Sequence, residues 1–191
     1  MNRRIVIKNL AFIIGGAALL PSCLKSNDGA SIHLNHLHFD GGQEKLMSDI
    51  CETIIPKTNT PGAKDLKLHL FVLMMVDDCY KRKDQQAFMI GLNDFKDIVE
   101  KKYRQSFSDL DNKQREAVLN GIEKNGNIHI HGGKRQKTHN ISPINVFYGG
   151  VKQHTIIGYT TSQYFMTKQI VYELIPGRYN AHFPAKKLIA V

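Results

Sequence analysis

The chain has 191 residues, of which 42% are hydrophobic and 23% charged, and its formal net charge is +9. This length suits one domain with one core, and the composition excludes a wholly disordered protein. The basic side chains are not interleaved with aromatic ones, as a surface for stacking bases requires, so nucleic-acid binding is disfavoured.

The first residues indicate an export signal. Arg3 and Arg4 precede two apolar residues, and Lys8 follows shortly after, which is the arrangement that a twin-arginine translocon reads. Residues 10–20 are uncharged and too few for a membrane span, which needs about 20 residues. The sequence Leu-Pro-Ser-Cys then resembles the lipobox of bacterial lipoproteins and predicts lipidation of Cys23.

These features predict an exported lipoprotein that is anchored to a membrane and faces the periplasm. The stretch after Cys23 contains Ser, Asn, Asp and Gly and has no helical period, so it is interpreted as a linker. We expect a signal peptide over residues 1–22, a tether over 23–42 and a helical domain over 43–191.

Apolar side chains recur at three- and four-residue spacing along most of that domain, which predicts an all-α fold of about five orthogonally packed helices. The expected helices are 43–55, 66–81, 84–104, a fourth that starts at an Asp111–Gln114 capping box, and a fifth that Pro143 opens. Gly149 and Gly150 weaken the fifth helix, residues 158–162 break it, and the C-terminal segment is irregular.

A structural turn separates the first two helices. Pro56 and Pro61 fix the backbone angle φ, and Gly62 is free to adopt a conformation that other residues avoid. The sequence indicates that this turn sets the angle between the two helices.

Several residue types that often carry chemistry have a simpler interpretation here. The histidines fall in two groups within expected loops, where we interpret them as surface residues and expect no metal site. These histidines are His33, His36, His38, His129, His131 and His139. Ser162 has no G-x-S-x-G context, so a turn or helix cap is favoured over a catalytic nucleophile.

Cys51 and Cys79 lie on the first two expected helices. An oxidising envelope would permit a disulfide between them, although we favour two separate, buried thiols. No C-x-x-C or C-x-x-C-H spacing occurs, which excludes a motif-based redox pair or covalent haem.

Aromatic side chains gather in the last third of the chain, where Arg178 adds a planar cation. Tyr and Arg are favoured as interface anchors, whereas the alternative is that the tyrosines cover the helices as core. The candidates for a partner interface are Tyr159, Tyr164, Tyr172, Arg178 and Tyr179.

Three segments together resemble the gluconate 2-dehydrogenase subunit 3 family. They are Ile-Ile-Pro-Lys-Thr-Asn-Thr-Pro-Gly-Ala at 54–63, Phe-Ser-Asp-Leu at 107–110, and Gly-Tyr-Thr-Thr-Ser at 158–162 followed by Pro-Gly-Arg-Tyr at 176–179. The first segment is the most specific, and the resemblance covers most of the chain after the signal.

The resemblance implies a small, exported, non-catalytic subunit of a membrane-associated flavin-dependent sugar dehydrogenase. Such a subunit supplies the export signal for a flavoprotein large subunit of the glucose-methanol-choline type and stabilises it. FAD is expected in the partner and no cofactor in this chain, and some complexes of the family add a cytochrome c subunit. The alternative is a free-standing envelope lipoprotein that binds a ligand or acts as a scaffold. An autonomous enzyme is disfavoured, since no motif marks an acid and base pair.

Overall fold

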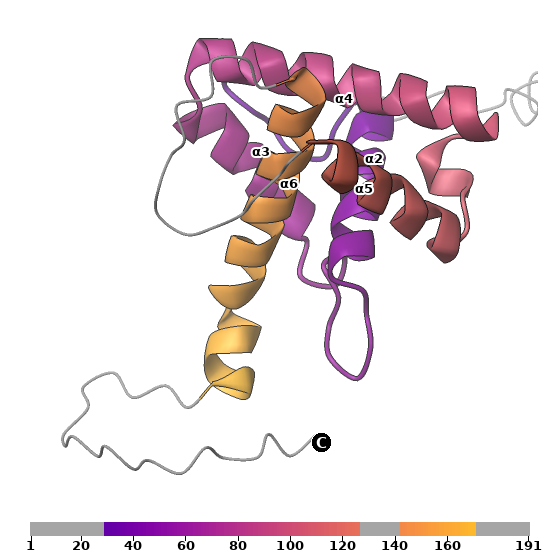
Figure 1. Cartoon of the computed structure of the whole chain (residues 1–191). Coiled ribbons are helices and arrows are strands. Elements are labelled where there is room, and N and C mark those ends of the chain that lie inside the picture. Colours follow the sequence, from indigo (N-terminus) through magenta and orange to yellow (C-terminus); the bar gives the residue numbers. More distant parts are fainter. Residues whose placement is uncertain (1–28, 127–141, 171–191) are drawn as a thin grey trace, which may run out of the picture.

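The computed structural model describes residues 29–126 and 142–170, and these residues form an all-α domain (Figure 1). The helices are α2 (Gly41–Ile54), α3 (Leu68–Cys79), α4 (Arg82–Tyr103), α5 (Asn112–Gly126) and α6 (Pro143–Thr160), with a 3-10 turn η1 (Phe107–Asp109) and a π-helical turn η2 (Phe165–Gln169). The predicted fold class is confirmed. None of the helices in these two ranges is long and apolar enough to span a bilayer.

Helix α6 is the central element, because it packs against α2, α3, α4 and α5. Figure 1 shows it running across α4, which lies along one side of the domain. Phe147 of α6 contacts the rings of Phe88 and Phe95 of α4 at centroid distances of 5.0 and 5.6 Å, and Phe95 contacts Phe107 of η1 at 5.2 Å. This aromatic row joins α4, α6 and η1 in a single core.

The fifth helix ends within the predicted segment 158–162, at Thr160, although Gly158 itself is still helical. A Cβ atom added at Gly158 would lie 2.8 Å from the Phe71 ring of α3, and one at Gly150 would lie 2.8 Å from the Tyr80 hydroxyl. The absent side chains therefore let α3 and α6 approach closely, and this packing outweighs the weak helix propensity of glycine.

Two capping boxes set the start of α2 and α5. Asp111 and Gln114 exchange the two hydrogen bonds that the sequence predicted, at 2.7 and 3.2 Å. Asp40 and Gln43 form the same motif at α2, so this helix starts two residues earlier than predicted. Capping satisfies backbone N–H groups that would otherwise lack a partner at the helix start.

The second half of the predicted tether belongs to the folded domain. Leu34 and Phe39 are buried in the core at 7% and 8% exposure. Between them, the backbone N–H groups of consecutive residues from Asn35 to Leu37 donate to the buried Asp77 carboxylate of α3. Apolar burial and these charge-assisted hydrogen bonds fix a segment whose composition alone indicated a linker.

Candidate protein-interaction site

The turn between α2 and α3 folds around the Glu52 carboxylate. Its Oε1 accepts a hydrogen bond from the Lys57 backbone N–H at 2.9 Å, and its Oε2 accepts one from the Lys64 backbone N–H at 2.7 Å. The Ala63 N–H donates to the Ile55 carbonyl at 2.9 Å and closes the turn. The Glu52 carboxylate, near the end of α2, thus binds the backbone near both ends of residues 56–64.

Gly62 is required in this turn for a different reason from the one predicted. A Cβ atom added there would lie 2.6 Å from the Lys57 backbone nitrogen and 2.6 Å from Oε1 of Glu52. Its φ angle is not in the left-handed region. The glycine is therefore needed because the chain passes close to Glu52, and Pro56 and Pro61 stiffen the turn on either side.

A second carboxylate, that of Asp49, joins this turn to the rest of the domain. The Asp49 side chain is 3% exposed, accepts hydrogen bonds from Lys64 Nζ and Ser108 Oγ, and lies 3.9 Å from a guanidinium nitrogen of Arg115. Arg115 also donates to the backbone carbonyls of Phe107 and Ser108 at 3.1 and 2.6 Å. These contacts connect α2, the turn, η1 and α5 through a buried, compensated charge.

The role of Asp49 was not predicted, although its position in the sequence indicates one. The residue stands in α2 between Leu46 and Ile50, which are both buried. A carboxylate on an apolar helix face must find cations or hydrogen-bond donors, because an unpaired buried charge is costly. The same reasoning applies to Asp77, which is 1% exposed on α3.

The end of α6 approaches the same turn. The Tyr159 hydroxyl donates to Thr60 Oγ1 at 3.5 Å, and the Tyr159 ring packs on the Phe165 ring at a centroid distance of 5.6 Å. Ser162 Oγ donates to the Tyr159 carbonyl and accepts from the Phe165 N–H. The turn interpretation of Ser162 is confirmed. We call the turn 56–62, the end of α6 and η2 together the docking end.

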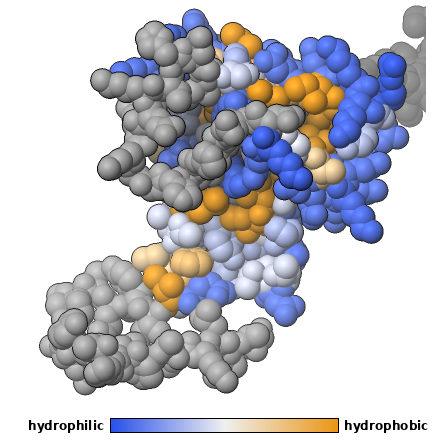
Figure 2. Space-filling view, in the orientation of Figure 1, coloured by the Kyte–Doolittle hydropathy of each residue, from blue (hydrophilic) through white to orange (hydrophobic). Residues whose placement is uncertain are grey.

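The docking end exposes apolar side chains. Ile156 and Ile157 on α6 are 38% and 37% exposed, and Ile170, directly after η2, is 39% exposed. Figure 1 shows this part of the chain extending away from the other helices, and Figure 2 shows hydrophobic surface at its tip. Exposed aliphatic side chains on a projecting helix suit contact with another protein.

Only part of the predicted interface set falls within the described residues. Tyr159 is half-buried against the core, and Tyr164 is half-buried with its hydroxyl accepting a hydrogen bond from Gln169 Nε2 at 2.7 Å. Tyr172, Arg178 and Tyr179 lie outside the described residues, as do the signal residues Arg3, Arg4, Lys8 and Cys23. The exposure of Ile156, Ile157 and Ile170 was not predicted from the sequence.

The two cysteines of the domain are separate free thiols. Cys51 is buried and accepts a hydrogen bond from Thr155 Oγ1 at 3.2 Å, and burial raises the pKa of its thiol to about 12. Cys79 is exposed at the end of α3. The preferred prediction of two buried thiols is therefore confirmed for Cys51 and wrong for Cys79.

The histidines of the tether are exposed, as predicted, whereas His129, His131 and His139 lie outside the described residues. Within residues 29–126 and 142–170, no three His, Cys, Asp or Glu side chains gather as metal ligands would. His154 is instead buried in α6, with Nε2 3.1 Å from the Tyr80 hydroxyl. Burial lowers the pKa of His154, because it penalises the charged imidazolium.

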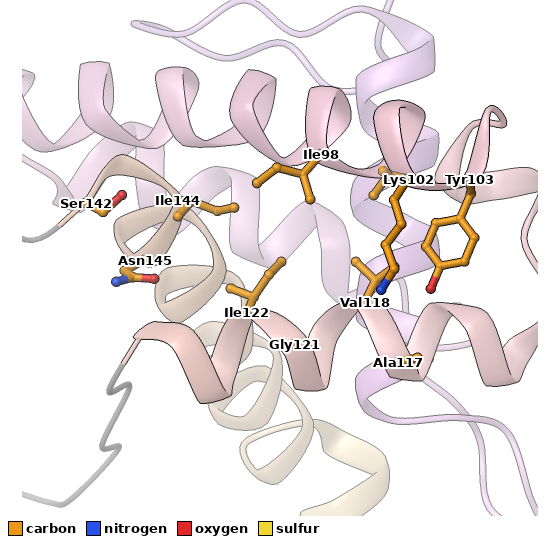
Figure 3. A pocket seen from close by; sticks show the side chains of 11 residues that line it. Ile98, Lys102, Tyr103, Ala117, Val118, Gly121, Ile122, Ser142, Ile144 and Asn145 are labelled. Carbon is orange, nitrogen blue, oxygen red and sulfur yellow. The ribbon is translucent and has the colours of Figure 1, made fainter.

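An apolar groove lies between α4, α5 and the start of α6 (Figure 3). Its volume is about 450 Å³, and Ile98, Ile122 and Ile144 contribute much of its lining. The side chain of Lys102 reaches across it from α4 towards α5. Nearby, Glu123 accepts hydrogen bonds from Lys152 and Tyr148, and these donors lower the pKa of the Glu123 carboxyl. The groove is apolar and contains no pair of facing acid and base groups among its lining residues.

The family-like segments meet in this geometry as far as they lie within the described residues, which exclude 176–179. Residues 54–63 contain the turn, residues 107–110 contain η1 and connect to the turn through Asp49, and residues 158–162 end α6 beside Thr60. The family model for gluconate 2-dehydrogenase subunit 3 matches residues 42–177. Comparison with curated proteins and with solved structures gave no significant match. The chain belongs to the gluconate 2-dehydrogenase subunit 3 family.

Proposed function

We propose that the chain is the non-catalytic small subunit of a flavin-dependent sugar dehydrogenase complex of the gluconate 2-dehydrogenase type. The observation that carries the proposal is a family match over residues 42–177 on a chain that begins with a twin-arginine pattern. In this proposal the small subunit supplies the export signal for the large subunit and stabilises it. The twin-arginine route transports folded cargo, so one signal can serve two assembled chains.

The partner in this proposal is a large flavoprotein of the glucose-methanol-choline type, which holds FAD and carries out the oxidation. A cytochrome c subunit would accept the electrons in complexes that contain one. Arg3, Arg4 and Lys8 would direct export, and lipid on Cys23 would hold the complex on the periplasmic face of a membrane.

We propose that the docking end contacts the flavoprotein. Its exposed Ile156, Ile157 and Ile170 can lose water contact only against another surface, and Tyr159 and Tyr164 offer half-buried rings beside them. The Glu52 and Asp49 carboxylates hold the turn on the domain, and the hydrogen bond from the Tyr159 hydroxyl to Thr60 Oγ1 links the turn to the end of α6. A preformed apolar patch of this kind binds without a large ordering cost.

Affinity purification of the tagged mature domain from its own envelope fraction tests the carrier role. A flavoprotein in equal amount, seen by the visible absorbance of its flavin, supports the proposal. With Arg3→Lys and Arg4→Lys, both chains should remain in the cytoplasm. Arg82→Lys and Arg104→Lys make the same chemical changes on the exposed surface of the domain and should leave export intact. A colourless monomer in the wild-type preparation would refute the subunit role and favour a free-standing lipoprotein.

The contact surface needs its own comparison. Ile156→Ser with Ile157→Ser should abolish purification of the flavoprotein with this chain, since both side chains are exposed and their loss should not unfold the domain. Ile90→Ser removes an isoleucine that is 53% exposed on α4 and should leave the complex intact. Equal recovery of flavoprotein with both variants would exclude the docking end as the contact.

A further inference from the structure

The chain packs against the domain and is hydrogen-bonded to it well before α2 begins. Gly29 forms an isolated antiparallel bridge with Asp40, and Ser31 donates hydrogen bonds to the Glu44 carboxylate from both its N–H and its hydroxyl. Together with the bonds to Asp77, these contacts hold the whole stretch from Gly29 to Asp40 against α2 and α3. Among the described residues, the contacts of the chain with α2 and α3 therefore begin at Gly29.

Because these contacts begin at Gly29, the link between Cys23 and the first residue held by the domain is short. Gly29 is six residues after Cys23. Six residues span at most about 20 Å, and a flexible linker of that length has a root-mean-square extension of about 13 Å. A free tether up to Gln43 would instead reach about 70 Å when extended. With the longer tether, a lipid on Cys23 would only keep the domain near the membrane. With a link of six residues, it also restricts the orientation of the domain.

We propose that the face around the start of α2 rests on the phospholipid bilayer that holds lipidated Cys23, and that the docking end points away from it. Figure 1 shows the chain entering the domain beside the start of α2, whereas the end of α6 and η2 lie at the other end of the view. Helix α2 has 14 residues and is about 21 Å long, and the turn 56–62 follows its far end. Turning the docking end to the membrane would require the six-residue link to extend fully.

The face at the start of α2 carries exposed charged side chains of both signs. Lys45 and Lys96 are exposed and line one groove together with the carboxylates of Asp40, Glu100 and Asp109. The Asp40 carboxylate is occupied by the capping box of α2. Because the acidic side chains of this groove outnumber the basic ones, the proposed orientation rests on the short link to Cys23 and not on attraction to anionic headgroups.

The proposal rests on the lipidation of Cys23, so the test first establishes that modification by mass and by flotation with vesicles. The full chain is reconstituted into vesicles of phosphatidylethanolamine and phosphatidylglycerol, some of which carry a nitroxide on the headgroup. A fluorophore is placed through Lys45→Cys or Thr160→Cys, both exposed positions, in a Cys79→Ser background, because Cys79 is the exposed thiol. Quenching at position 45 should exceed quenching at position 160 several-fold.

A longer link provides the matched control. Inserting 14 Gly and Ser residues between Asp28 and Gly29 restores a link of about 20 residues and leaves every contact of the domain in place. The ratio of quenching at the two positions should then fall towards one. Equal or reversed quenching in a chain that is lipidated and floats would overturn the orientation alone. A chain whose Cys23 carries no lipid would overturn both the orientation and the anchoring on which it rests.

Discussion

Replacing Gly62 by alanine tests the reasoning about the turn most directly. The new Cβ atom would meet the Lys57 backbone nitrogen and the Glu52 carboxylate at 2.6 Å. A side chain can rotate away, but a backbone nitrogen cannot move without opening the turn. The Glu52 carboxylate would then lose its hydrogen bonds to the Lys57 and Lys64 N–H groups.

The expected cost follows from these two effects. Forcing an extra methyl group into a filled space costs about 1–3 kcal/mol. Hydrogen bonds to a charged group contribute about 1.5 kcal/mol each at the lower end, and these two are exposed, so only part of that is lost. We expect Gly62→Ala to lower the free energy of unfolding by about 2–4 kcal/mol, which corresponds to a fall in Tm of about 6–12 °C.

Thermal unfolding of the mature domain measures this, with Gly121→Ala as the control. Gly121 lies within α5 and has no heavy atom within 4 Å of an added Cβ, so the same substitution should stabilise the helix by about 0.5–1 kcal/mol. A Gly62→Ala domain that melts at or above the wild-type temperature would refute the close approach to Glu52, since only the reduced entropy of the unfolded chain would then remain.

Three further predictions concern buried groups. Arg115→Leu should lower the free energy of unfolding in urea by about 2–3 kcal/mol, because it removes two hydrogen bonds and a cation near buried Asp49; a loss below about 0.5 kcal/mol, typical of a surface pair, would contradict this. Burial lowers the pKa of His154, so the unfolded state binds more protons below the ordinary value of 6.5, and stability is lost as the pH falls through that range. The drop in Tm between pH 7 and pH 5 should therefore be smaller in His154→Gln than in the wild type. An equal drop in the two proteins would show that other titrating groups cause it. A thiol reagent should modify Cys79 in the folded protein and Cys51 only after unfolding, whereas equal rates would contradict the burial of Cys51.

Local patterns were sufficient to predict the helices and several of their ends. Apolar spacing located the five α-helices of the described residues, the Asp111 and Gln114 pair marked the start of α5, and Pro56 marked the end of α2. These signals lie within a few residues of the structure they determine, because capping bonds and helical periodicity are short-range effects. The three family segments could also be recognised without coordinates.

The remaining features depend on residues that are far apart in the chain. Asp77 binds backbone groups some 40 positions earlier and turns an expected tether into part of the core. Gly158 stays helical because Phe71 of α3 packs on it, and Asp49 is stable inside the domain because Lys64, Ser108 and Arg115 surround it. The sequence by itself determined the helices, the position of the turn and the family of this protein. Only the tertiary structure decided where the tether ends, how far α6 runs and which side chains meet at the docking end, because long-range packing and burial set the energies of those contacts.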